Sequence, residues 1–190
     1  MTEPDPVHRR VSDVRFVDLA RAVAQSLRGR TVATAESCTA GRVMATLVTV
    51  EHAAEVEHAA EFVRGGLVAY QECVKRDVLG VDASSVYSHQ AVQQMARGVA
   101  GLLDADAAVS TSGVIGDAAV DGTEPGTLYI ATFVDGQVRS ERHVVHGEPD
   151  VMCGEAVLLA LDALRGHARR ADEQTATQRI VHGCVPGAAG

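Results

Sequence analysis

The chain has no tryptophan, few other aromatic residues and no long apolar segment, and each absence narrows what the protein can be. Aromatic residues make up 3% and hydrophobic residues 46% of the 190 positions, so the core must be built from Ala, Val and Leu. No apolar run approaches the roughly 20 residues of a membrane-spanning helix. The amino-terminal stretch MTEPDPVHRR lacks the apolar region of a secretory signal peptide. We therefore expect a soluble, cytoplasmic protein with no membrane partner.

Closely spaced cysteines and an excess of positive charge are also missing. The four cysteines form no CxxC pair, so a disulfide framework is not expected. The formal net charge is −8, whereas a general nucleic-acid binder usually carries a basic face. We expect no nucleic-acid partner, although this charge is compatible with a local basic pocket for one phosphate.

Helical and strand-like patterns alternate along the chain, whose length suits one α/β domain with its own core. We expect a three-layer α/β/α sandwich with a mixed sheet. The predicted strands are 31–35, 67–70, 107–111 and the arms of a hairpin turned by Asp135-Gly136, 127–134 and 137–145. The predicted helices are 12–27, capped by Ser12, then 39–50, 71–79, 88–103, capped by Ser88, and 150–168.

The domain is predicted to span residues 12–168, between a flexible amino-terminal tail at 1–11 and a polar, disordered tail at 169–190. One segment is unusual, because VEHAAE occurs at 50–55 and again at 56–61. A six-residue repeat is too short for a solenoid unit. We interpret it as a local duplication in an exposed helical extension. Its histidines do not share a helix face, so no metal site is expected there.

Candidate chemistry gathers where three predicted strands end. Ser37 follows the first strand, Tyr70 ends the second, and Ser112 follows the third. In open α/β sheets, ligands bind beyond the carboxyl ends of the strands. A helix starting near Thr39 would add free N–H groups and its positive dipole end, which suits a phosphate or an oxyanion. Ser37 is the candidate nucleophile and Lys75 the available base, if burial or nearby charge lowers the pKa of the lysine.

Purely structural roles explain the same residues equally well. Ser37 or Thr39 at a strand-to-helix turn is most often a helix cap, and Cys38 is more readily a small packed residue than a nucleophile. Tyr70 at a strand end could pack, relay a proton or hold Lys75 in place. Taken by themselves, spacing and residue type favour the cap and leave both readings open.

Three longer motifs resemble one known family. The segments ATAESCTAGRV, RGGLVAYQECVKRDVLGV and GTLYIA resemble the C-terminal domain of the competence/damage-inducible protein CinA family. Such domains also occur alone as nicotinamide mononucleotide deamidases of the PncC type, in pyridine nucleotide salvage. The resemblance covers about residues 14–165 and includes a nearly complete AESCTAG motif, where the family has AESCTGG.

The resemblance implies an α/β/α hydrolase that converts nicotinamide mononucleotide to nicotinate mononucleotide and ammonia. It implies that Ser37 is the nucleophile, assisted by Lys75 and Tyr70, and that no metal or cofactor takes part. The implied substrate-binding positions are Glu36, Thr39, Gly41, Ser112 and Gly113. Because family members tend to self-associate, a homo-oligomer is expected.

The chain departs from the family pattern on the side expected to bind substrate. The glycine-rich loop TGIAGPGGG of the family is SGVIGDAAV here, with Asp117 in place of the proline and Asp121 a little further on. The arginines of a family GDR segment are missing from 147–154, and Gln71-Glu72 replaces Ser/Thr-Asn. Three hypotheses follow. The chain deamidates nicotinamide mononucleotide, or it hydrolyses a different, less anionic amide, or it is a non-catalytic binding or interaction domain.

Overall fold

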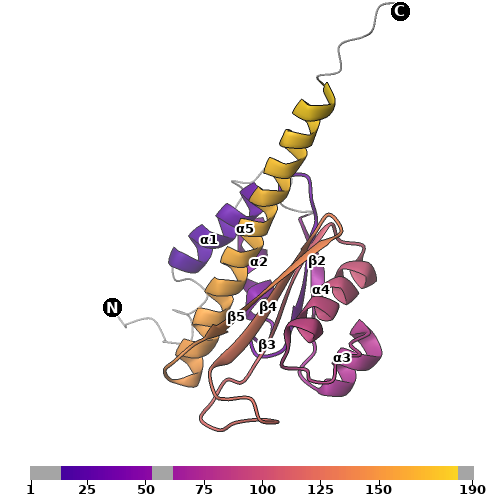
Figure 1. Cartoon of the computed structure of the whole chain (residues 1–190). Coiled ribbons are helices and arrows are strands. Elements are labelled where there is room, and N and C mark those ends of the chain that lie inside the picture. The colour runs from indigo at the N-terminus through magenta and orange to yellow at the C-terminus, as the bar shows by residue number, and fades with distance from the viewer. Residues whose placement is uncertain (1–13, 53–61, 184–190) are drawn as a thin grey trace, which may run out of the picture.

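The computed structural model describes residues 14–52 and 62–183, and this part of the chain forms a mixed five-stranded sheet between two layers of helices (Figure 1). The strands are β1 (Val32–Glu36), β2 (Val63–Val68), β3 (Ala107–Gly113), β4 (Thr127–Val134) and β5 (Gln137–Val144). The helices are α1 (Val14–Ser26), α2 (Arg42–His52), α3 (Glu72–Leu79), α4 (His89–Leu103) and α5 (Pro149–Gly183). The predicted α/β fold is confirmed.

The strand order is β2-β1-β3-β4-β5. β1 lies at the centre of a parallel set, with β2 on one side and β3 on the other, while β4 and β5 add the antiparallel hairpin. Every residue of β1 is buried, as expected for a strand covered on both faces. The three parallel strands therefore end at the same edge of the sheet, where the candidate residues were predicted to meet.

The two faces of the sheet are packed differently. α1, α2 and α5 cover one face over larger side chains of the sheet, such as Val32, Val109 and Ile130. α4 covers the other face, with α3 beside it, over alanines at 33, 35 and 108. Successive side chains of a strand point to opposite faces, so Val32 and Val109 face one helix layer while the alanines at 33, 35 and 108 face the other. Small side chains let α4 lie close to this part of the sheet.

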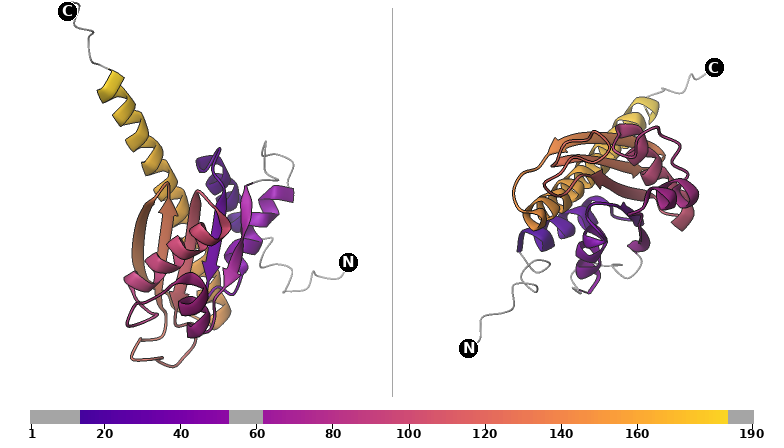
Figure 2. Two further views of the ribbon diagram at one scale, coloured as in Figure 1. Left: turned by 90° about the vertical axis from the view of Figure 1, so that its right-hand side faces the viewer. Right: turned by 90° about the horizontal axis from the view of Figure 1, so that it is seen from below.

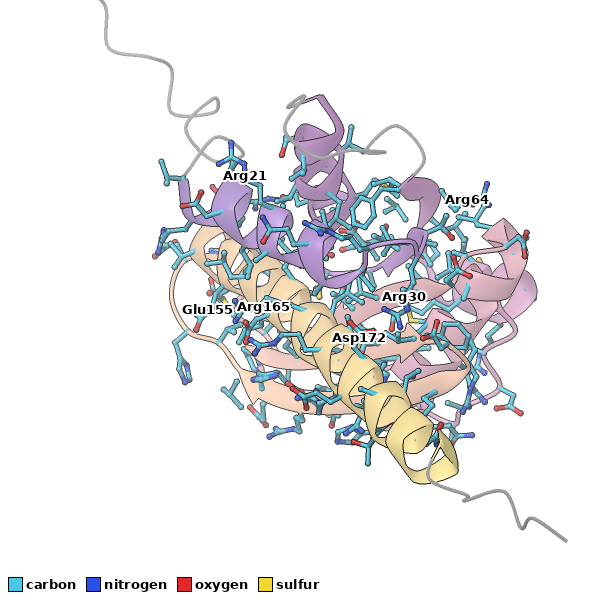
Figure 3. All side chains as sticks on the ribbon, turned by 90° about the horizontal axis from the view of Figure 1, so that it is seen from above. Arg21, Arg30, Arg64, Glu155, Arg165 and Asp172 are labelled. Carbon is cyan, nitrogen blue, oxygen red and sulfur yellow. The ribbon has the colours of Figure 1, made fainter. Side chains whose placement is uncertain are left out.

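The carboxyl-terminal helix is longer than predicted. Residues 169–183 continue α5 to Gly183, where the sequence analysis expected a disordered tail (Figure 2). Polarity alone suggested disorder, but this segment has no proline and is rich in Ala, Arg, Glu and Gln, which favour helix. An ion pair fixes the start of the extension, since Arg30 contacts Asp172 at 2.8 Å and also binds Asp135 (Figure 3).

Three other boundaries beside the candidate site differ from the prediction. β2 runs over Val63–Val68, where the sequence predicted a strand at 67–70, so Tyr70 follows the strand. α2 begins at Arg42 and not near Thr39, while β3 continues through Ser112 to Gly113. The predicted tail at 1–11, the Ser12 cap, most of the VEHAAE repeat and residues 184–190 lie outside the described residues. The Ser88 cap of α4 is confirmed, because its hydroxyl accepts a hydrogen bond from the Ala91 N–H at 3.1 Å.

Candidate active site

The carboxyl ends of β1, β2 and β3 are joined by main-chain hydrogen bonds around Glu36 and Ser37. The carbonyl of Glu36 accepts a bond from the N–H of Ala69 at 2.7 Å, just after β2. The N–H of Ser37 donates to the carbonyl of Thr111 in β3 at 3.0 Å. Residues 36 and 37 are thus fixed between both neighbouring strands, and the backbone position of Ser37 is set by the sheet itself.

Ser37 opens a tight turn that leads into α2. Ala40 and Gly41 both have left-handed backbones, with φ of +51° and +89°. Within the described chain the Ser37 hydroxyl forms no hydrogen bond, and the N–H groups of Cys38, Thr39 and Gly41 donate to no other residue. Backbone N–H groups gathered in such a turn form a concave site for negative charge. The turn therefore places an unbonded hydroxyl beside unused backbone donors.

Glu36 anchors this turn from inside the protein. Its carboxylate is 1% exposed and accepts hydrogen bonds from the N–H groups of Val43 at 3.0 Å and Met44 at 2.8 Å, in the first turn of α2. A carboxylate in this position caps a helix and neutralises the positive end of its dipole. The predicted use of this helix terminus for a phosphate therefore needs correction, because Glu36 already occupies these two donors.

Thr39 is a second internal support. Its hydroxyl donates to Glu36 at 2.7 Å and lies 2.8 Å from the hydroxyl of Thr111 in β3. With no exposed surface, its side chain links the turn to the sheet and does not cap α2. The predicted cap role of Thr39 belongs to Glu36 instead, and neither side chain is free to contact a substrate.

Lys75 is the only lysine among the 190 residues, and it is 2% exposed. It lies on α3, and its Nζ donates to the main-chain carbonyl of Tyr70 at 2.9 Å, just after β2. Burial lowers the pKa of this amine, with a smaller opposing influence from Cys38 and Glu72. A depressed pKa increases the neutral fraction that can accept a proton.

Tyr70 holds Lys75 through its backbone, while its own side chain is 69% exposed at the sheet edge. The structure brings Ser37, Tyr70 and Lys75 to the same edge, and no hydrogen bond joins their side chains. Of the three roles considered for Tyr70, holding the lysine corresponds to an observed contact. That contact involves the carbonyl oxygen and so does not depend on the phenol.

Cys38 is a poor nucleophile in this environment. Burial, followed by the nearby Cys153, raises the pKa of its thiol to about 12, and only a thiolate is strongly nucleophilic. Cys153 of α5 lies below the same turn, with Sγ 3.7 Å from the carbonyl oxygen of Cys38. Between the adjacent hydroxyl and thiol, the environment therefore favours Ser37 as the reactive group.

Comparison with known proteins places this site in a family. Residues 17–168 match the family model described as the CinA C-terminal domain. The chain belongs to the CinA C-terminal domain family. It is 33% identical over 180 residues to a CinA-like protein of Rippkaea orientalis, covering 85% of this chain and 42% of that protein. A CinA-like protein of Thermotoga neapolitana is 33% identical over 146 residues, which is 74% of this chain and 34% of the relative.

Solved structures of CinA superfamily proteins share the fold. One from Klebsiella pneumoniae superposes with a TM-score of 0.74 at 32% identity, covering 82% of this chain and 98% of that one. One from Escherichia coli gives 0.71 at 27% identity, covering 80% and 91%. The chain spans less than half the length of the curated CinA-like relatives described above.

In this CinA domain the other predicted substrate-binding positions belong to the framework. Ser112 has no exposed surface, and its hydroxyl donates to the carbonyl of Val86 at 2.8 Å. A Cβ atom at Gly113 would lie 2.5 Å from the carbonyl oxygen of Thr127, so glycine permits the close approach of β4. Gly41 provides the left-handed turn next to Val68. These contacts shape the site from below, and the substrate-binding predictions for Ser112 and Gly113 are revised to supporting roles, while Gly41 keeps a backbone N–H that donates to no other residue of the described chain.

One residue at the site was missed. Tyr87 follows Val86 in the loop before α4, and it is half-buried. Burial raises the pKa of its phenol, and Asp121, Tyr70, Cys38 and Glu72 raise it further. No motif marks Tyr87 in the sequence, because tertiary contacts through Ser112 bring it to the site. Lys75, in contrast, can be singled out from the sequence, because it is the only lysine in a chain whose other basic residues of this kind are arginines.

The part of the chain that the structure describes holds no group of three or more His, Cys, Asp or Glu side chains placed to bind a metal. The side chains of His52 and His58 of the repeat lie outside that part. None of the described helices combines the length and the apolar character needed to span a membrane.

Proposed function

We propose that this CinA domain is an amidohydrolase that converts nicotinamide mononucleotide, or a closely related pyridinium carboxamide, to the carboxylate and ammonia. The main support is the turn after β1, where an unbonded Ser37 hydroxyl stands beside unused N–H groups of Cys38, Thr39 and Gly41. The buried Lys75 at the neighbouring strand end supplies the base. A nucleophile, a base and an anion site are the three parts that acyl transfer requires.

In the first step, Ser37 Oγ attacks the amide carbon while neutral Lys75 Nζ accepts the hydroxyl proton. The carbonyl oxygen becomes negative and is stabilised by the N–H groups of Cys38 and Thr39. The C–N bond then breaks, and Lys75 returns the proton to the nitrogen. Ammonia departs, and the acyl group stays bound to Ser37 Oγ as an ester. Each oxyanion donor contributes on the order of 10²–10³ in rate, and a general base about 10²–10⁴.

In the second step, water attacks the ester carbon and gives its proton to Lys75. The bond to Ser37 Oγ breaks, Lys75 returns a proton to that oxygen, and the carboxylic acid product is released and ionises. The Tyr70 carbonyl accepts one N–H of the amine throughout. This contact leaves the nitrogen lone pair free to accept a proton in each step.

Ammonia release from nicotinamide mononucleotide tests this proposal. We expect turnover by the wild-type chain and its loss, by at least 10³-fold, in Ser37→Ala. Ser84→Ala is the matched control, because Ser84 is an exposed serine outside the turn at residues 37–41. Equal ammonia release by wild type and Ser37→Ala would rule out Ser37 as the nucleophile. No release by wild type from this substrate or from related pyridinium amides would rule out the amidohydrolase.

The acidic loop between β3 and β4 favours a second candidate, a binding domain without catalysis. Residues 114–126 contain Asp117, Asp121 and Glu124 and no lysine or arginine, which is unfavourable for a phosphate-bearing substrate. A thermal shift with mononucleotides, without any ammonia release, would support this candidate. Turnover would remove it.

A further inference from the structure

β5 forms one edge of the sheet, and its outer side pairs with no other strand of the described chain. Its eight residues pair with β4 without a bulge, and the strand contains no proline. Bulges and prolines are devices by which proteins block an exposed edge, whose free N–H and C=O groups otherwise attract another strand. The other edge strand, β2, has six residues, includes Gly65-Gly66 and shifts register against β1. β5 is therefore the edge better suited to pairing.

Alternate residues of β5 direct their backbone groups toward this edge. The N–H of Val145 donates to the carbonyl of Gly126, which lies directly opposite across the hairpin, at 2.9 Å. In an antiparallel pair, every second residue exchanges its hydrogen bonds with the residue opposite. The odd-numbered residues of β5 therefore bond to β4. The N–H and C=O groups of residues 138, 140, 142 and 144 point outward.

The face of β5 on the α5 side carries one cation and one anion. Arg139 lies opposite Thr132, whose hydroxyl is 2.8 Å from His167 of α5, so Arg139 is on this face. Its guanidinium forms no hydrogen bond or ion pair with any described residue, and its Nε is buried without a partner. Glu141, two residues further on, shares the face and contacts His143 at 3.2 Å, with 48% of its side chain exposed. An unpaired guanidinium thus lies one strand position from an exposed carboxylate.

We propose that β5 pairs antiparallel with β5 of a second copy of this chain, about a two-fold axis at Ser140. Because outward-pointing groups must face each other, the axis lies at a residue and not between two residues. An axis at Arg139, Glu141 or Arg142 would place two like charges directly opposite each other, which is destabilising. The axis at Ser140 instead places Arg139 opposite Glu141 of the second copy, and this ion pair forms twice. The proposal does not depend on the amidohydrolase function.

The helices leave room for this arrangement. Ser140 Oγ lies 3.0 Å from His89 Nδ1 and accepts a hydrogen bond from Gln93 Nε2 at 2.8 Å, so α4 holds the strand at the axis. α5 packs on β3 and β4, at least one strand in from the edge. Neighbouring strands lie about 4.8 Å apart, so the two β4 strands would be separated by three such spacings, about 14 Å. The two α5 helices would then lie further apart than the roughly 8–10 Å of packed helices.

Sedimentation velocity of the full chain at low ionic strength tests the proposal. We expect the wild type to dimerise. Arg139→Glu and Glu141→Arg should each raise the dimer Kd about tenfold or more, because like charges then lie opposite each other twice. The double variant Arg139→Glu/Glu141→Arg should recover dimerisation, and an equal mixture of the two single variants should form a heterodimer. Arg64→Glu is the matched control, because Arg64 is an exposed arginine on the opposite edge strand, β2.

Each result decides the proposal. A wild type that stays monomeric at every soluble concentration overturns it. A dimer that both single variants leave unchanged, or that Arg64→Glu weakens equally, places the interface elsewhere and also overturns it. If both single variants are monomeric and neither the double variant nor the mixture dimerises, the register about Ser140 is wrong. Circular dichroism checks folding. Should Arg139→Glu fail to fold, Glu141→Arg and the double variant decide the question.

Discussion

At the scale of single residues, Lys75 occupies an environment that its residue type normally avoids. It is 2% exposed and is the only lysine in the chain. Arginine supplies the positive charge elsewhere but cannot lose its proton in a protein. A neutral amine at the sheet edge is thus a function that none of the sixteen arginines could provide.

We predict that Lys75→Arg lowers kcat/KM by about 10²–10⁴-fold, the usual contribution of a general base. The arginine can still donate to the Tyr70 carbonyl and keeps the positive charge. If Lys75 acted only through its charge, kcat/KM would therefore change little in this variant. For the wild type, kcat/KM should fall as the pH drops through the depressed pKa of Lys75, because protonation removes the base. A pH-independent rate across this range would argue against a proton-accepting lysine.

Ala40 is strained by the same turn that carries the nucleophile. Its φ of +51° is unfavourable for a residue with a Cβ atom, by roughly 1 kcal/mol. We predict that Ala40→Gly raises the free energy of unfolding by about this amount in urea denaturation. Ala45→Gly, at an exposed position inside α2, should lower it by about 1 kcal/mol. A loss of stability in both variants would contradict the assigned backbone strain.

At the scale of helices and strands, local patterns predicted the elements, and tertiary contacts set the boundaries. α4 was predicted because an apolar stripe and the Ser88 cap lie within one segment. The hairpin was predicted because Asp135-Gly136 specifies its own turn. The start of α2 was missed, since its cap is Glu36 at the end of β1. The extension of α5 was missed because Arg30, 142 residues away, anchors it.

The packing of α5 on β4 contains a buried histidine that makes stability depend on pH. His167 is 1% exposed and lies 2.8 Å from the hydroxyl of Thr132. Burial, with Arg139 and Arg170 nearby, lowers the pKa of His167 to about 4. Below a pH of about 6.5 the unfolded histidine binds a proton that the folded one rejects.

We therefore predict that stability falls as the pH drops from about 6.5 toward 4, with His167 contributing up to about 3 kcal/mol. Urea denaturation of wild type and His167→Gln across this pH range isolates the contribution of His167 to the free energy of unfolding. The carboxylates are the same in both proteins, so their effect cancels in the comparison. The variant should lose less stability on acidification. If the two proteins lose the same amount, the histidine is not the titrating group.

At the scale of the whole molecule, the two ends of the sheet have different tasks. The amino ends of the parallel strands are closed by polar contacts, from Arg30 to Asp135 and Asp172 and from Asp106 to Thr31. The carboxyl ends carry Ser37, Tyr70 and Lys75. The sequence predicted that the ends of the three parallel strands meet at this edge, and the strand pairing confirms it. The catalytic roles of Ser37, Tyr70 and Lys75 stay predictions. It could not separate framework from site, because Thr39 and Ser112 are fixed by contacts with Thr111 and Val86, which lie far from them along the chain.

The central claim is that Ser37 forms a covalent acyl intermediate, and mass spectrometry of the acid-quenched reaction tests it most directly. During turnover of nicotinamide mononucleotide, we predict that the peptide containing Ser37 gains the mass of the substrate less that of ammonia. Fragmentation should place this mass on Ser37 and not on Cys38, whose thiol is held protonated by its pKa of about 12. Acylation of Cys38, or turnover with no adduct on this peptide, would contradict the account.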